Sequence, residues 1–75
     1  MSLLLPQIRA GTVRSIRPVD IHSDRYVDLV VLLDGAGAVP ITGRVSATEC
    51  PLDLTLGERV KVNLTMGVIT SVSRA

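Results

Sequence analysis

Hydrophobic and polar residues alternate with a period of two along most of the chain, and no helical periodicity is visible. This alternation is typical of β-strands with one buried face. In residues 39–46, the face expected to be buried carries Val39, Ile41, Gly43 and Val45. In residues 59–66, the corresponding positions are Val60, Val62, Leu64 and Met66. A further strand is expected after Gly67, which predicts a tight turn, with one face formed by Val68, Thr70 and Val72.

Two earlier segments predict strands of a different character. Residues 8–17 form a strand whose alternation is blurred around Gly11, and a glycine inside a strand often marks a bulge or a close backbone approach. Residues 25–34 carry apolar residues on both faces of their second half, since Val30 and Leu32 lie opposite the expected core face. A fully buried central strand and a contact face for another chain both explain this pattern. We favour the contact face, because exposed apolar patches are rare in monomers.

The connections complete the predicted topology. Residues 34–37, Asp-Gly-Ala-Gly, predict a hairpin loop. Residues 48–56 contain Cys50, Pro51 and three leucines, which predict a short helical turn that closes one barrel end. The order of elements predicts an all-β, five-stranded OB-like Greek-key barrel with this connector before the fourth strand. We place one domain at residues 8–75 behind an N-terminal extension at residues 1–7, with a cloning origin of residues 1–3 as an open alternative.

Composition adds an expectation about partners. A 75-residue domain is marginally stable unless something assists it, and Cys50 is the only cysteine, so a disulfide cannot. We therefore expect self-association through the strand at residues 26–33, from its face with Tyr26 and Val30. The single cysteine and the absence of a signal peptide predict a cytoplasmic protein. A net charge of +1 and a single aromatic residue argue against nucleic-acid binding.

Candidate chemistry is sparse, and we expect no enzyme activity from this domain. His22 lies between Asp20 and Asp24, a pattern compatible with a metal ligand, but a solvated loop is the favoured interpretation and no metal is expected. Cys50 has no nearby base in the sequence and is expected to be an inert thiol. The glycines at residues 35–37 are too few for a phosphate-binding loop, and no Lys-Ser or Lys-Thr follows them.

One polar group points to a ligand. Residues 42, 44, 46 and 48 fall on one face of a predicted strand, where they place hydroxyl groups beside the guanidinium of Arg44. Such donors bind small tetrahedral oxyanions. The solvent-facing side of any strand has a similar composition, and on composition alone we favour that plainer explanation.

Several stretches, taken in order, resemble a known family. Residues 10–16 (Ala-Gly-Thr-Val-Arg-Ser-Ile) are similar to an opening Gly-x-Val-x-x-Ile, and residues 30–35 followed by 41–46 resemble the middle of the same repeat. Residues 54–62 resemble a Leu-x-Leu-x-x-Gly-x-x-Val signature, apart from the spacing around the glycine. Together these stretches, which extend over about residues 8–72, resemble the transport-associated OB (TOBE) domain and its relative, the molybdate-binding Mop domain.

The resemblance implies an OB-type fold that pairs with a second copy. Such domains are commonly appended to the ATP-binding subunit of a bacterial ABC importer, and they meet the membrane only indirectly, through the transporter. We therefore expect a non-catalytic accessory or regulatory domain of such a subunit. A free-standing Mop-type molybdate- or tungstate-binding protein is the main alternative, and a nucleic-acid-binding OB domain is a third.

The resemblance also implies ligand positions, and here the chain departs from the pattern. Binding members carry Ser-Ala-Arg-Asn before the first strand, where residues 4–7 are Leu-Leu-Pro-Gln. Their threonine and serine fall on Ser46 and Glu49, and their lysine falls on Thr65. A carboxylate at Glu49 repels an anion, so a conventional molybdate site is not expected. The best candidates for ligands, if molybdate or another tetrahedral oxyanion binds at all, are Arg44, Ser46, Thr48 and Thr65, and no other cofactor is expected.

Overall fold

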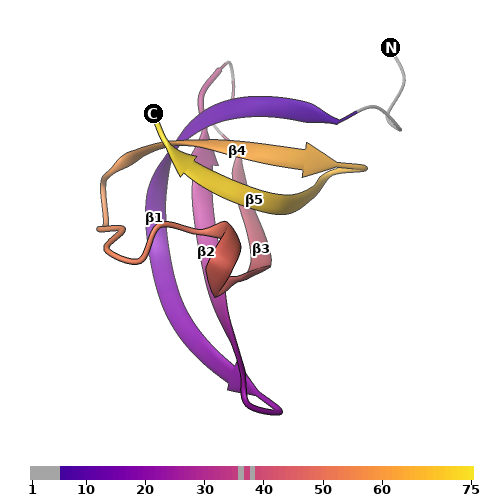
Figure 1. The fold of residues 1–75 in the computed structure, drawn as a ribbon. Coiled ribbons are helices and arrows are strands. Elements are labelled where there is room, and N and C mark those ends of the chain that lie inside the picture. The colour runs from indigo at the N-terminus through magenta and orange to yellow at the C-terminus, as the bar shows by residue number, and fades with distance from the viewer. Residues whose placement is uncertain (1–5, 36, 38) are drawn as a thin grey trace.

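The computed structural model describes residues 6–35, 37 and 39–75, which form one antiparallel five-stranded sheet (Figure 1). Its elements are β1 (Gln7–Ile21), β2 (Asp24–Leu33), β3 (Pro40–Ser46), the 3-10 helix η1 (Ala47–Glu49), β4 (Arg59–Thr65) and β5 (Val68–Arg74). The prediction of an all-β fold with five strands and a connector before the fourth is confirmed. The predicted helical connector is only a single 3-10 turn of 3 residues.

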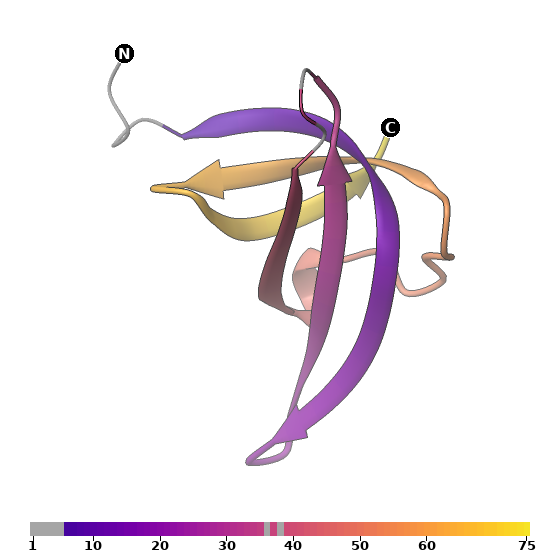
Figure 2. The same cartoon turned by 180° about the vertical axis from the view of Figure 1, so that it is seen from behind.

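The long strand β1 organises the sheet, whose order is β3-β2-β1-β4-β5. Its first part pairs with β4 and its later part with β2, and Gly11 and Thr12 pair with both. Because β1 curves, β4 and β5 cross over the β2–β3 layer, as Figures 1 and 2 show from opposite sides. The edge strands β3 and β5 contact each other, but no hydrogen-bonded ladder joins them within the described ranges, so the sheet is not closed.

Gly11 lies where β1 exchanges one partner strand for the other. A Cβ atom at this position would lie 2.7 Å from Val31 Cγ1 and 2.8 Å from the carbonyl oxygen of Leu32. Of the two roles expected for this glycine, close backbone approach is therefore confirmed. The register shift of β1 falls further along, between Val13 and Ser15.

The core lies between the two crossing layers and consists of aliphatic side chains. Its most deeply buried members are Leu29, Ile69, Val13, Val31, Val60 and Val62. The buried face predicted for residues 25–34 is confirmed, as are Val60, Val62 and Leu64 in residues 59–66. Met66 and Val39, also predicted on buried faces, are 65% and 61% exposed because they lie outside the ends of β4 and β3. The face predicted for the last strand is wrong, because Val68 is exposed whereas Ile69 and Val72 are buried. A register shift opposite Asn63 and Leu64 leaves Thr70 without a direct partner and reverses the alternation.

The connector between η1 and β4 uses only part of its apolar content for the core. Leu54 packs against the core and Cys50 is buried, but Leu52 is 94% exposed and Leu56 is 67% exposed. The prediction that all three leucines close a barrel end is therefore wrong. Arg74 holds the connector instead, since its Nη2 donates to Asp53 Oδ1 at 2.8 Å and its Nε donates to the Glu58 carboxylate.

Two strand pairs are joined by tight turns. The β1–β2 turn consists of His22 (φ 50°) and Ser23 (φ 70°), so Asp20 and Asp24 lie in strands and not in the predicted loop. The β4–β5 turn has Met66 (φ 53°) before Gly67 (φ 79°), which confirms the turn predicted there. Positive φ at both central residues is the geometry of a type I′ hairpin turn.

Met66→Asn is expected to stabilise the domain by about 0.5–1 kcal/mol, because asparagine tolerates left-handed backbone conformations better than methionine. Urea denaturation followed by circular dichroism measures this change. Leu56→Asn is the matched control, since Leu56 is 67% exposed against 65% for Met66 and does not have a positive φ. Equal effects of the two substitutions would show that backbone strain at Met66 is not the cause.

Candidate functional site

The outward face of the β1–β2–β3 layer carries most of the residues that the sequence singled out. Since Leu29, Val31 and Leu33 of β2 are buried, the alternate residues of this strand face outward. Residues paired directly across strands share a face, and the register aligns four rows on this surface. We call it the outer face; its rows are Val19, Tyr26 and Ser46; Arg17, Asp28 and Arg44; Ser15, Val30 and Thr42; and Thr12, Leu32 and Pro40.

The charged row at the centre of the outer face contains a two-point ion pair. Arg44 Nε donates to Asp28 Oδ1 at 2.7 Å, and Arg44 Nη2 donates to Oδ2 at 3.0 Å. These hydrogen bonds, with a smaller contribution from the charge of Arg17, hold the pKa of Asp28 below its usual value. Arg17 forms no salt bridge in the part of the chain that the structure describes. The row therefore combines two cations with one anion.

Half-buried apolar residues surround this charged row. Val19, Tyr26, Val30 and Leu32 are all of intermediate exposure. Strand β2, expected to be a contact strand, is central in the sheet and is paired on both sides. Of the two alternatives left by the sequence, a fully buried central strand is wrong, because β2 is central but its outer face is only half-buried. Contact of this face with another chain stays a prediction. A partner on this face would meet side chains and not a free backbone edge.

The four expected oxyanion ligands do not form one cluster. The Ser46 and Thr48 hydroxyl oxygens lie 3.0 Å apart, and Ser46 Oγ also accepts from the Thr48 backbone N–H at 3.4 Å, which caps η1. Two donors of Arg44, on Nε and Nη2, are taken by Asp28. Thr65 ends β4 and pairs with Val68, and no hydrogen bond among residues of the described ranges joins it to the other three.

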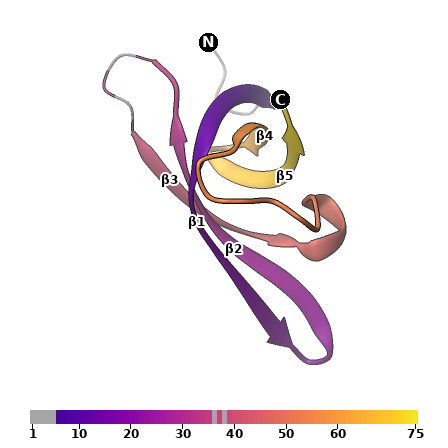
Figure 3. The same ribbon diagram turned by 90° about the vertical axis from the view of Figure 1, so that its left-hand side faces the viewer.

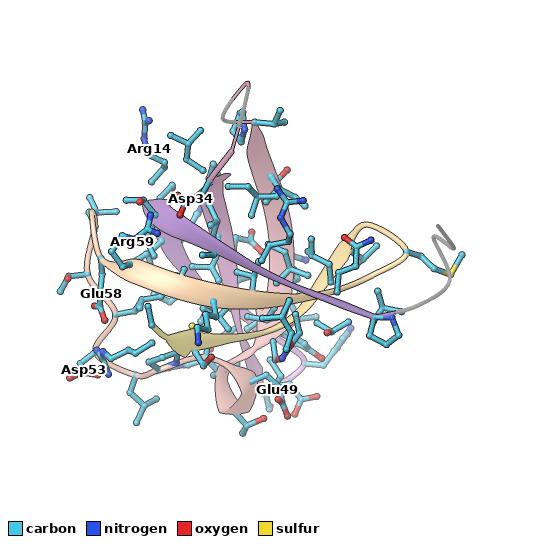
Figure 4. The ribbon with its side chains drawn as sticks, turned by 90° about the horizontal axis from the view of Figure 1, so that it is seen from above. Arg14, Asp34, Glu49, Asp53, Glu58 and Arg59 are labelled. Atoms are coloured by element: carbon cyan, nitrogen blue, oxygen red, sulfur yellow. The ribbon has the colours of Figure 1, made fainter. Side chains whose placement is uncertain are left out.

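A second charged cluster, which sequence reasoning did not single out, joins three segments at one end of the sheet. Arg59 of β4 makes a two-point ion pair with Asp34, which follows β2, and its Nη1 donates to Thr12 Oγ1 at 3.1 Å. Arg9 donates to the Asp34 carbonyl oxygen at 3.2 Å. Figure 4 shows Asp34 and Arg59 side by side and Glu49 at the opposite side of the view. Hydrogen bonds from Arg59 lower the pKa of Asp34. Arg9, Thr12, Asp34 and Arg59 are each hydrogen-bonded to another residue of this cluster.

The remaining reactive side chains are isolated. His22 lies in the exposed β1–β2 turn, and Asp20 pairs with Arg25 at 3.1 Å. Across residues 6–35, 37 and 39–75, no three His, Cys, Asp or Glu side chains are grouped so that they could hold a metal ion. Burial raises the pKa of the Cys50 thiol, so the reactive thiolate is disfavoured at neutral pH.

The sequence matches no protein-family model and no curated protein, and the fold matches no solved structure. None of the helical segments in the described residues has the length and apolar character needed to cross a membrane.

Proposed function

We propose that this chain is a non-catalytic accessory domain of the transport-associated OB kind, which acts by protein contacts and pairs with a second copy through the outer face. The observation that carries the proposal is the partial exposure of Tyr26, Val30 and Leu32 around an ion-paired centre. Association would remove these apolar side chains from water, which is the main driving force for protein contacts. It would also assist a domain too small to be very stable alone.

The strand arrangement supports an OB-like, partly open barrel as the scaffold of this function. Its order is β3-β2-β1-β4-β5, with β1 shared between two layers and with β3 in contact with β5. Such an arrangement is compatible with a five-stranded Greek-key barrel that lacks its last ladder. The resemblance of residues 10–16 and 54–62 supports a cytoplasmic role in the ATP-binding subunit of a bacterial importer.

Protein contact is a better interpretation of the outer face than oxyanion binding. An oxyanion at Arg44 would compete with the Asp28 carboxylate, which accepts two hydrogen bonds from it. The Ser46 and Thr48 hydroxyl groups form a hydrogen bond with each other, and Glu49, the next residue after Thr48, carries a negative charge. A carboxylate next to these hydroxyl groups in the sequence repels an anion, which opposes oxyanion binding.

Sedimentation velocity over a range of protein concentrations tests the pairing. We expect a reversible dimer, and Val30→Lys should weaken it at least about tenfold, because a charge replaces a half-buried valine in the middle of the outer face. Ser73→Lys is the matched control, since it adds the same charge at an exposed position of β5 and should leave association unchanged. A wild-type protein that stays monomeric up to its solubility limit would contradict the proposal.

Calorimetric titration separates this proposal from the Mop-type alternative. We expect no binding heat with molybdate, tungstate, sulfate or phosphate. Heat confined to molybdate and tungstate, and lost in Ser46→Ala, would instead establish an oxyanion-binding protein.

A further inference from the structure

The hairpin formed by β1 and β2 extends beyond the rest of the sheet as an arm. Its two strands remain paired as far as Ile21 and Asp24, whereas the pairing of β2 with β3 stops at Tyr26. Figure 3 shows this arm projecting past η1 and the connector. Because Asp24 is two residues from Tyr26 on β2, the row formed by Ile21 and Asp24 lies on the same side of the sheet as the outer face. We call this row the arm row.

Two opposite charges on this side of the sheet have no ion-pair partner. Arg17 in the charged row and Asp24 in the arm row are both exposed, and neither forms a salt bridge within residues 6–35, 37 and 39–75. Arg17 pairs in register with Asp28, which is held by Arg44 and is four residues beyond Asp24 along β2. This separation is about 14 Å, so a single copy does not bring the two free charges together.

An open recess of about 470 Å³ lies in the outer face beside the charged row. The side chains of the outer face that line it are Ser15, Arg17, Asp28, Val30, Thr42 and Arg44. An enclosed cavity of about 150 Å³ holds a benzene molecule, so the recess has room for more than one side chain. Its lining has two guanidinium groups and one carboxylate, which leaves one positive charge in excess. A segment that enters the recess should therefore bring a carboxylate.

The spacing of the rows is self-complementary. The charged row and the arm row lie equally far, by two residues on each strand, on either side of the row that contains Val19 and Tyr26. A two-fold axis along this middle row, between two stacked copies, places the charged row of each copy opposite the arm row of the other, so every contact forms twice. Neighbouring strands are about 4.8 Å apart, and the flexible Arg17 side chain is long enough to reach Asp24 of the second copy.

We propose that two copies pair in antiparallel register, with the arm of each copy in the recess of the other and with Asp24 of one opposite Arg17 of the other. This inference rests on the pairing proposed above and names the contact that selects its register. Each free charge then meets the opposite charge that its own copy does not supply, and the half-buried Ile21 and Tyr26 are removed from water. A second copy is favoured over an unrelated partner because one chain carries both charges at the spacing that a two-fold axis requires.

Charge reversal followed by sedimentation velocity tests this contact. Arg17→Glu and Asp24→Lys should each weaken self-association at least about tenfold, because each substitution turns two attractive contacts into two repulsive ones. An equimolar mixture of the two variants should recover most of the lost affinity as a heterodimer. In that heterodimer the introduced glutamate faces the introduced lysine, and the native pair forms at the other contact. Both substituted positions are exposed, so the fold of each variant is expected to be unchanged.

Lys61→Glu and Glu49→Lys are the matched controls. They make the same changes in net charge at exposed positions outside the outer face, and neither residue forms a salt bridge in the described part of the chain. Neither control should weaken the dimer, and mixing them should not strengthen it. A wild-type dimer that both reversals leave unchanged, or a mixture without recovery, would overturn this inference and leave the pairing itself intact. A wild-type protein that stays monomeric would contradict both.

Discussion

Gly11→Ala is expected to lower the free energy of unfolding by about 3 kcal/mol, although alanine is normally preferred to glycine inside a strand. The added methyl group would lie 2.7 Å from Val31 Cγ1 and 2.8 Å from the Leu32 carbonyl oxygen. Backbone cannot move aside as a flexible side chain does, so β1 or β2 must shift. Because Gly11 pairs with both Leu33 and Val60, such a shift disturbs two ladders. A domain of this size has a total stability of about 4–11 kcal/mol, so the loss is a large fraction of it.

Urea denaturation of the Gly11→Ala protein measures this effect. Ser15→Ala is the control on the same strand, at an exposed position where a change within about 0.5 kcal/mol is expected. A Gly11→Ala protein as stable as the wild type would show that the strands at this crossing are free to separate, and that the bend of β1 does not require glycine.

Gly43→Ala should also be strongly destabilising, by about 2 kcal/mol, because it forces apart the two edge strands. Gly43 of β3 faces Ile69 of β5, and a Cβ atom there would lie 2.9 Å from Ile69 Cβ and 3.0 Å from its Cδ1. Ile69 is 2% exposed and has little room to adjust. Only a residue without a side chain permits β3 and β5 to approach this closely.

A double-mutant cycle with Ile69→Ala measures that contact directly. In the Ile69→Ala background, Gly43→Ala should cost less than in the wild type, because the contacts with Ile69 Cδ1 and Cγ1 are gone while the close contact with the Cβ atom of residue 69 remains. If Ile69→Ala does not fold, Ile69→Val supplies the same comparison with a smaller expected coupling. Thr42→Ala, at an outward position of the same strand, should be additive with either substitution. Additive effects of Gly43→Ala and Ile69→Ala would mean that β3 and β5 are not in contact.

Much of the strand content could be predicted from alternation alone, but not the length or phase of every strand. The segment predicted at residues 8–17 is part of β1, Gln7–Ile21, because the arm is held by pairing with β2 and not by burial. The pattern of hydrophobic residues does not reveal a strand that is held only by backbone pairing. The face of β5 was missed because Thr70 is an extra residue opposite β4, and a one-residue shift reverses every later side chain.

In the candidate site, too, the sequence predicts which way a side chain faces but not which residue it contacts. The outward position of Arg44 follows from its place between Gly43 and Val45, both on the core side of β3. Its partner Asp28 is 16 residues away and is brought opposite only by the register of β2 and β3. Opposite charges on neighbouring predicted strands indicate that an ion pair could form between them. They do not identify the pair, because many strand registers would bring some acidic residue opposite some basic one. Thr65 was grouped with Ser46 by motif resemblance, and no contact in the described ranges joins them.

The sequence by itself determined the all-β fold class of this protein. Period-two alternation, an aliphatic core almost without aromatic residues and turn residues such as Gly67 specify antiparallel strands and most of their buried faces, since these depend on neighbours along the chain. Only the tertiary structure decided that β1 is shared by two layers, that β2 is central, and that residues of three strands form the recess of the outer face. Those features join residues tens of positions apart. Their distances depend on strand register and on the exchange of partner strands along β1, which no local pattern encodes.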